Sequence, residues 1–344
     1  MLFEHVHLEA FGHALPSEVT TSKQLEEQLA PLYERLSLNV GRLELMSGIL
    51  ERRHWPEGTR PSEVATLAAE DALGRCDIDR SRIGMLVHAA VCRDFLEPAT
   101  ASVVHGALGL PETATAFDLS NACLGFVNAM ALVAHAIETG TIEAGMVVAG
   151  EDGGPLVRQT IRALLDNPGV GRRDVKLAYA SLTIGSGAAA CILTRDSISR
   201  VKRKLLGGIS KAATQHVGLC QGDQVGRDGP LMETDSEALL IAGNSLAKRT
   251  WTAFLRHMRW EQPVIDRVVT HQVGAAHRKL LLETLNINPT IDYPTVAQLG
   301  NIGSVSLPLT YDLAERAEHI QPGQRVALLG IGSGLHCCML GVQA

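Results

Sequence analysis

The chain has 344 residues, of which 46% are hydrophobic, enough for a large core in two domains or in one domain made of two similar halves. Its 31 basic and 37 acidic side chains give a net charge of −6 without a dominant basic run, so nucleic acid is not expected as a partner. Seven cysteines, without a C-x-x-C pair, favour the reduced thiols of a cytoplasmic protein over disulfides or a zinc site. No signal-like segment opens the chain and no apolar stretch reaches ~20 residues, so we expect neither secretion nor a membrane span.

Short apolar runs alternate along the chain with segments of helical spacing. Strands are predicted at Gly84–Val91, Gly145–Gly150, Arg267–Val273 and Arg325–Gly330, and helices at Ser62–Cys76, Gly125–Glu138 and Ser236–Leu255. Strands this apolar are typical of sheets buried on both faces, and their alternation with helices predicts an α/β layered fold. The stretch Leu206–Pro230, rich in glycine and polar residues, is predicted to be a loop.

Two pairs of segments recur in the same order. Met85–Val91 resembles Val268–Val273, and about 60 residues after each, a second apolar strand ends in a glycine-rich turn, at Met146–Gly154 and Val326–Gly334. This pattern predicts a duplicated fold with halves at residues 1–195 and 196–344, joined near Leu193–Val201. Chance similarity between short apolar strands is the alternative.

Cys123 stands where a strand-like run meets an alanine-rich helical segment that begins at Gly125. The free N–H groups and the dipole of a helix N-terminus favour the thiolate, which is the nucleophilic form of cysteine. The position therefore predicts a nucleophile, and a buried core cysteine is the alternative.

His271 ends an apolar strand, and Asn301 lies in a turn between Gly300 and Gly303. A neutral imidazole can donate a hydrogen bond to a thioester oxygen or take a proton, and an amide held by a tight turn can stabilise an enolate oxygen. Taken alone, their positions favour a histidine satisfied in the core and a plain turn asparagine.

Two more segments carry candidate residues. Gly330–Gly334 follows a strand but ends 10 residues before the C-terminus, which leaves no room for a nucleotide-binding βαβ unit. We expect this motif to bring backbone N–H groups close to a reacting oxygen. Glu97 lies in the loop after a strand, a position typical of a solvated surface acid.

Taken together, the motifs resemble those of the thiolase superfamily and, within it, the ketoacyl synthase III-like enzymes. The resemblance spans nearly the whole chain and rests on Gly48–Arg53, Asn121–Cys123, His271–Gln272, Gly300–Ser304 and Gly330–Gly334. It implies a five-layered αβαβα fold of two similar halves and a tight homodimer. It also implies Cys123 as acyl acceptor, His271 and Asn301 as the rest of a Cys-His-Asn triad, and the N–H groups of Cys123 and Gly334 as oxyanion donors.

Val91–Pro98 and Leu335–Cys337 resemble the OleA type of these enzymes, which condense two acyl-CoA thioesters without decarboxylation. The resemblance places Glu97 at a glutamate that reaches the active site of the neighbouring subunit and acts as a base. It implies an acyltransferase that makes a β-keto product through an acyl-Cys123 intermediate. The expected substrates are acyl-CoAs, with an acyl carrier protein as an alternative donor, and neither a cofactor nor a metal is expected.

Three other functions stay open on the sequence. The first is a synthase III that condenses acyl-CoA with malonyl carrier protein by decarboxylation. The second is an acyltransferase of the same fold that makes an ester or an amide. The third is a catalytically silent acyl-binding homologue.

Overall fold

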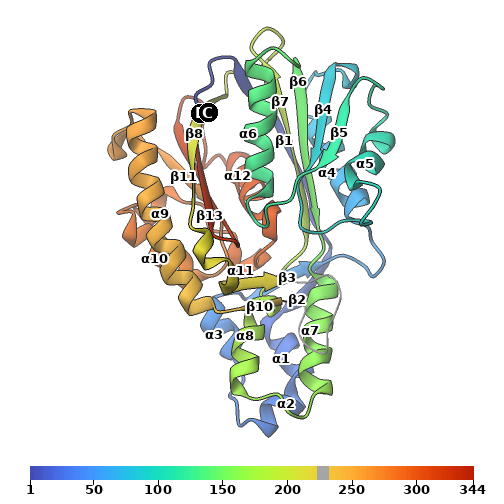
Figure 1. Cartoon of the computed structure of the whole chain (residues 1–344), viewed down its shortest axis with the longest axis vertical. Helices are drawn as coiled ribbons and strands as arrows, with labels where there is room; N and C mark the ends of the chain where they lie inside the picture. The colour runs from blue at the N-terminus through green and yellow to red at the C-terminus, as the bar shows by residue number, and fades with distance from the viewer. Residues whose placement is uncertain (223–231) are drawn as a thin grey trace.

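Nine strands form one continuous sheet, and the two halves of the chain occupy its opposite ends (Figure 1). The computed structural model describes residues 1–222 and 232–344. The strand order is β11-β12-β13-β8-β1-β7-β6-β4-β5. These strands are β1 (Val6–Ala14), β4 (Ile83–His88), β5 (Thr115–Asp118), β6 (Ala144–Glu151), β7 (Gly187–Arg195), β8 (Lys204–Ala212), β11 (Arg267–Thr270), β12 (Arg325–Gly332) and β13 (His336–Gln343).

The two ends of the sheet repeat the same pairing pattern. In the first half, β1 pairs antiparallel with β7, β7 antiparallel with β6, and β6 parallel with β4. In the second half, β8 pairs antiparallel with β13, β13 antiparallel with β12, and β12 parallel with β11. The segments that recur in the sequence therefore take matching places, β4 with β11 and β6 with β12, which confirms the prediction of two similar halves. The halves meet where His7 of β1 pairs with Lys204 of β8. The predicted boundary at residues 195 and 196 falls between β7 and β8.

Helices cover the outer face of each half and fill the space between the halves (Figure 1). The outer helices are α4 (Pro61–Leu73) and α5 (Thr100–Leu108) on the first half and α9 (Ser236–Met258) and α10 (Ala275–Thr284) on the second, and the central ones are α6 (Gly125–Glu138) and α12 (Ser306–Arg316). Alternate residues of β6 show this layering, because Val147 and Ala149 pack in the central core with α6, whereas Met146 and Val148 pack against α4. The layers follow the expected α-β-α-β-α order.

A smaller group of elements forms a cap at the lower end of the molecule in Figure 1. It contains α1 (Ser22–Gln28), α2 (Ala30–Arg35), α3 (Arg42–Ser47), α7 (Gly154–Asp166), α8 (Arg172–Leu182), and the strand pairs β2 (Glu18–Thr21) with β3 (Glu51–His54) and β9 (Cys220–Gly222) with β10 (Met232–Thr234). Its helices share a separate apolar core. A short helix, α11 (Val296–Leu299), packs against β3. Within the described residues, no helix has the length and apolarity required to cross a membrane.

The predicted helix at Gly125–Glu138 matches α6, and α4 and α9 differ from their predictions by a few residues at their ends. The prediction of a loop at Leu206–Pro230 is wrong for its first part, which forms most of β8 and then β9. A β-carbon on Gly207 would lie 2.4 Å from the Met1 carbonyl oxygen, and one on Gly208 would lie 2.1 Å from that of Met339. These glycines therefore permit close strand packing rather than a loop. Residues 223 to 230 lie outside the described part of the chain.

Candidate active site

Cys123 lies between β5 and α6, two residues before the first residue of the helix, as the sequence predicted. Ala122 has a left-handed φ of 48°, which turns the chain sharply just before the cysteine. Gly125 packs so closely on β4's continuation that a β-carbon would lie 3.0 Å from the Ala89 carbonyl oxygen. The turn holds the Cys123 side chain half-buried at the start of the central helix.

The environment of Cys123 opposes ionisation in the free chain. Burial raises the pKa of the Cys123 thiol to about 12, and negative charge on Glu151 and Cys220 adds to the rise. The sequence-based expectation that the helix start favours the thiolate is therefore outweighed by burial. Attack on a thioester requires that the proton leave as the substrate reacts.

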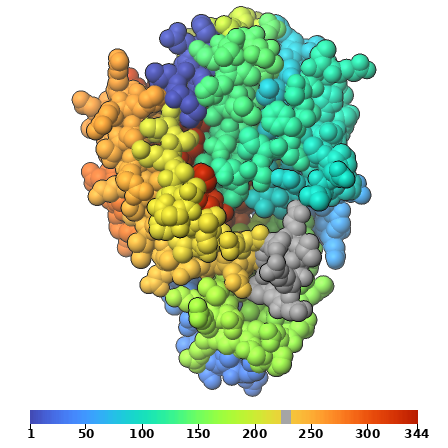
Figure 2. Space-filling model, in the orientation of Figure 1, coloured from blue at the N-terminus to red at the C-terminus, as the bar shows by residue number. Residues whose placement is uncertain are grey.

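The glycine-rich turn between β12 and β13 lies against the segment that carries Cys123. A β-carbon on Gly332 would lie 3.1 Å from the backbone nitrogen of Leu124 and 3.4 Å from the carbonyl oxygen of Asn121. Gly334, with a φ of 76°, is partly exposed in the same turn. In the space-filling view, atoms of the red C-terminal segment are visible between the yellow β8–β9 region and the green α6 (Figure 2). This motif therefore packs against residues on both sides of the cysteine, Asn121 and Leu124.

His271 follows β11 and is 3% exposed. Its backbone N–H donates a hydrogen bond to the Leu329 carbonyl oxygen at 3.0 Å. Burial, and then the charge of His277, lower the pKa of His271 to about 3, so the imidazole is neutral at physiological pH. Within the described residues its buried Nδ1 has no hydrogen-bond partner. A neutral ring offers one N–H donor and one nitrogen acceptor.

Gln272 links the histidine to the segment that leads to Asn301. Its side-chain oxygen accepts the N–H groups of Thr295 at 3.0 Å and Val296 at 3.2 Å. Val296 begins α11, which ends two residues before Asn301. In the sequence, Gln272 is recognisable only as part of a motif with His271, because no local pattern signals its burial or its distant hydrogen-bond partners.

Asn301 is held by backbone and side-chain hydrogen bonds. Its N–H donates to the Thr183 carbonyl at 3.0 Å, its own carbonyl accepts from Gly185 at 2.9 Å, and its Oδ1 accepts the N–H of Gly303 at 3.0 Å. Gly300 has a φ of 68°, and a β-carbon there would lie 2.6 Å from the Thr183 oxygen, so the turn requires glycine. With Oδ1 engaged, the Nδ2 group is the part of this partly exposed side chain that can donate to a ligand.

Glu151, the last residue of β6, is a member of this site that sequence reasoning missed. It is buried, its charge contributes to the raised pKa of the Cys123 thiol, and its Oε1 accepts hydrogen bonds from both Val91 and Ser304. The sequence placed Glu151 at the end of an apolar strand before a glycine-rich turn. That position was a usable signal, because a carboxylate there is rarely buried without a specific set of donors.

Glu97 lies in the loop between β4 and α5 and is exposed to solvent in the single chain. Its neighbour Leu96 is 82% exposed and Val91, at the start of the loop, is 51% exposed. The segments of Cys123 and His271 both contact β12, and the Asn301 turn contacts Glu151 at the end of β6, whereas Glu97 is exposed on a partly apolar arm.

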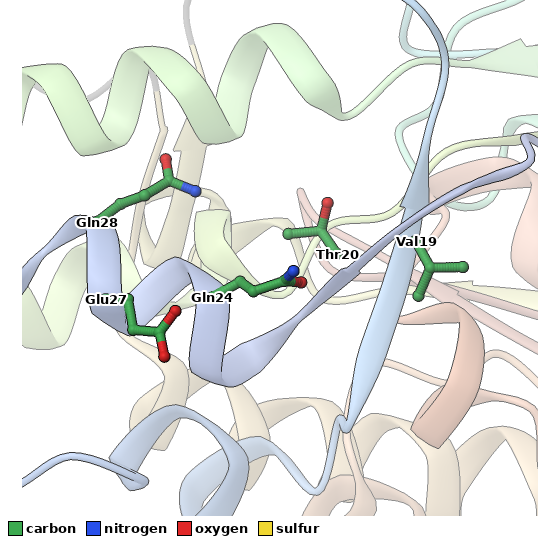
Figure 3. Close-up of a pocket in the computed structure, with 5 residues that line it drawn as sticks. All are labelled: Val19, Thr20, Gln24, Glu27 and Gln28. Carbon is green, nitrogen blue, oxygen red and sulfur yellow. The ribbon is translucent and has the colours of Figure 1, made fainter.

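Two surface pockets lie outside this site. One of about 440 Å³ is lined by Val19 and Thr20 of β2 and by Gln24, Glu27 and Gln28 of α1 (Figure 3). The other, of about 740 Å³, lies beside the end of α9. The lining of neither pocket includes a candidate catalytic residue.

One cluster, His13 with Asp71 and Asp312, has the composition of a metal site. Burial opposes ionisation of Asp312, but hydrogen bonds from His13, Arg316 and Arg75 hold the pKa of its carboxyl well below the usual range. These donors at 2.5 to 3.1 Å satisfy its oxygens, so the cluster is a charge network that joins α4, β1 and α12.

Three family models match the chain. The thiolase N-terminal domain matches residues 46–160, 3-oxoacyl-[acyl-carrier-protein] synthase III matches residues 117–207, and the C-terminal domain of that synthase matches residues 255–343.

Curated relatives match over nearly the full length. The chain is 41% identical to an acyl-CoA:acyl-CoA alkyltransferase of Shewanella oneidensis over 100% of both chains, and 35% identical to one of Xanthomonas campestris over 98% of both. It is 29% identical to a beta-ketoacyl-[acyl-carrier-protein] synthase III of Rhodospirillum rubrum over 94% of both.

Solved structures of Xanthomonas campestris OleA superpose on the whole chain. A cysteine-to-serine variant with bound lauric acid and lauroyl-CoA has a TM-score of 0.95 at 34% identity and covers 100% of both chains. The cerulenin-bound enzyme has a TM-score of 0.95 at 35% identity, over 100% of this chain and 98% of that one.

Proposed function

The chain belongs to the thiolase superfamily and, within it, to the OleA-type acyl-CoA:acyl-CoA alkyltransferases, and we propose on this basis that it joins two fatty acyl-CoA thioesters by a non-decarboxylative Claisen condensation. The observation that carries the proposal is the 41% identity over the full length of an enzyme of that name. The segments of Cys123, His271 and Asn301 provide a nucleophile, a neutral imidazole and a fixed amide for this chemistry.

In the first half-reaction, the sulfur of Cys123 attacks the thioester carbonyl carbon of one acyl-CoA. The thiol proton is lost to His271 or to the leaving coenzyme, the carbon–sulfur bond to CoA breaks, and CoA departs as the free thiol. The backbone N–H groups of Cys123 and Gly334 stabilise the tetrahedral oxyanion, and loss of one such donor typically costs ~10²–10³ in rate. The acyl group remains on sulfur.

In the second half-reaction, a carboxylate removes a proton from the α-carbon of the second acyl-CoA. The resulting enolate oxygen accepts hydrogen bonds from His271 and from Nδ2 of Asn301. The α-carbon then attacks the carbonyl of acyl-Cys123, a carbon–carbon bond forms, and the cysteine sulfur leaves with the electron pair. The product is a β-ketoacyl thioester, and the reaction requires no cofactor or metal.

Glu97 of the neighbouring subunit is the proposed base. Within the single chain this side chain points into solvent, as expected for a group that completes another subunit's site. The X. campestris variants include substitutions of a glutamate and of a cysteine that are 26 residues apart, the separation of Glu97 and Cys123 here. A homodimer also fits β5, which ends the sheet and whose outer edge pairs with no other described strand, so a second copy can extend the sheet.

A cytoplasmic location and free CoA thioesters as both substrates complete the proposal. All seven cysteines are unpaired, as in a reducing compartment. An acyl carrier protein as donor is the alternative for substrate delivery, and lipid synthesis is the process that a β-keto product of this kind would serve.

The test follows the two half-reactions with mass-tagged acyl-CoA. Cys123→Ala is expected to abolish both acylation and condensation, whereas Glu97→Gln is expected to acylate normally and fail to condense. Normal condensation by Glu97→Gln would exclude the proposed base. Release of carbon dioxide only after addition of malonyl carrier protein would indicate the synthase III reaction instead.

A further inference from the structure

Glu151 connects two segments that the proposed mechanism uses for the condensing step. The residue ends β6 and is 4% exposed, so its carboxylate lies in the interior. Its carboxylate accepts hydrogen bonds from the start of the arm that carries Glu97 and from the turn that carries Asn301. These two segments are more than 200 residues apart in the chain.

The arm is fixed to Glu151 at its first two residues. The N–H of Val91 donates to Oε1 at 3.0 Å, and the N–H of Cys92 donates to Oε2 at 3.1 Å. Cys92 is also held by the next residue of the β6 end, because the N–H of Asp152 donates to its sulfur at 3.4 Å. The arm therefore leaves the core from a point that Glu151 defines.

The Asn301 turn is fixed to the same carboxylate. Ser304 donates to Oε1 twice, through its hydroxyl at 2.7 Å and through its N–H at 3.2 Å. A β-carbon on Gly303 would lie 3.0 Å from this oxygen, so the turn packs directly on the carboxylate. Gly303 is also the residue whose N–H holds Oδ1 of Asn301.

Four donors on a buried carboxylate form charge-assisted hydrogen bonds, which are about twice as strong as neutral ones. Oε1 is shared between the two segments, so movement of either one weakens the hydrogen bonds to the other. The negative charge of Glu151 also contributes to the raised pKa of the Cys123 thiol. The carboxylate therefore joins the start of the arm to the Asn301 turn.

We infer that Glu151 is a positioning residue for the condensing step, which holds the Asn301 turn of its own site and the arm that delivers Glu97 to the neighbouring site. This inference rests on the proposed function. Because the two groups serve different subunits, one carboxylate in each protomer sets the geometry of parts of both active sites. Acylation of Cys123 uses neither group.

The experiment compares Glu151→Gln with Glu9→Gln as a matched control. Glu9, in β1, is 2% exposed and accepts hydrogen bonds from Thr194, Ser199 and Arg200, so it is an equally buried carboxylate with a comparable number of donors. The Gln side chain keeps the size of Glu but places an NH₂ group against one of the N–H donors. Acylation by lauroyl-CoA and condensation are measured separately on each variant.

Glu151→Gln is expected to lower the condensation rate about 10- to 100-fold, since a misplacement of ~1 Å costs about 10²-fold. Acylation is not expected to slow, because loss of the negative charge removes one cause of the raised pKa of Cys123. Glu9→Gln is expected to leave the ratio of the two rates unchanged. Ser304→Ala, which removes one of the two donors from the Asn301 turn, is expected to fall between Glu151→Gln and the wild type. An equal loss of both rates in Glu151→Gln would overturn the inference, and so would wild-type condensation.

Hydrogen exchange tests the same inference without turnover. In Glu151→Gln, peptides from residues 89–99 and 300–306 are expected to exchange faster together, and in Glu9→Gln neither changes. Faster exchange in one segment only would show that Glu151 does not join them. Loss of condensation in Glu151→Gln together with normal condensation in Glu97→Gln would instead refute the role of Glu97 in the proposed function.

Discussion

Substitution of Gly332 by alanine tests whether the glycine-rich turn supports the nucleophile. Gly332 has no left-handed φ, so the effect of a β-carbon is steric, and that carbon would lie 3.1 Å from the Leu124 nitrogen and 3.4 Å from the Asn121 oxygen. Relief of the shorter contact requires the cysteine segment to move by roughly 0.5 Å. If a displacement of ~1 Å costs about 10²-fold in rate, we expect acylation of Cys123 to fall by about tenfold. Overpacking is also expected to destabilise the fold by about 1–3 kcal/mol.

The assay is time-resolved mass spectrometry of the intact protein after mixing with lauroyl-CoA, together with thermal unfolding. The matched control is Gly106→Ala in α5, where a β-carbon meets no atom within 4 Å. This control is expected to gain about 0.5–1 kcal/mol of stability from the better helix former and to acylate normally. The reasoning fails if Gly332→Ala is destabilised yet acylates at the wild-type rate, because the turn would then support the fold without positioning the cysteine.

Two predictions concern pH. Burial lowers the pKa of His88 to about 4. As the pH falls, the unfolded chain, with a histidine pKa near 6.5, therefore binds the proton before the folded chain does, and the free energy of unfolding decreases between pH 6.5 and 4. By pH 5 this one residue lowers the free energy of unfolding by about 2 kcal/mol. In urea unfolding, the free energy of unfolding of His88→Gln should therefore decrease less between pH 7 and 5 than that of the wild type. An equal decrease in the two proteins would refute the prediction. Because the pKa of Cys123 is about 12, its alkylation by iodoacetamide should rise about tenfold per pH unit from 7 to 9, with Cys123→Ala as the blank. A plateau below pH 9 would contradict this.

Local sequence was sufficient for the elements and for the position of the nucleophile. The boundaries of α6 follow from an apolar helical run after a turn, and the turn itself places Cys123 at the start of the helix. The similarity of β4 to β11 and of β6 to β12 was visible because each strand carries its own apolar pattern. The glycines at 207 and 208 misled the same reasoning, since a strand that is closely packed also needs glycine.

Tertiary structure determined the pKa values of the site residues and the hydrogen bonds that connect distant segments of the site. The pKa values of Cys123 and His271 depend on burial by segments that no local pattern identifies. Glu151 takes its hydrogen bonds from residues 60 and 153 positions away, so its role exists only in the folded chain. The sequence shows only that a glutamate stands near a strand end. Whether its buried charge is stable depends on hydrogen-bond donors that only folding brings to it.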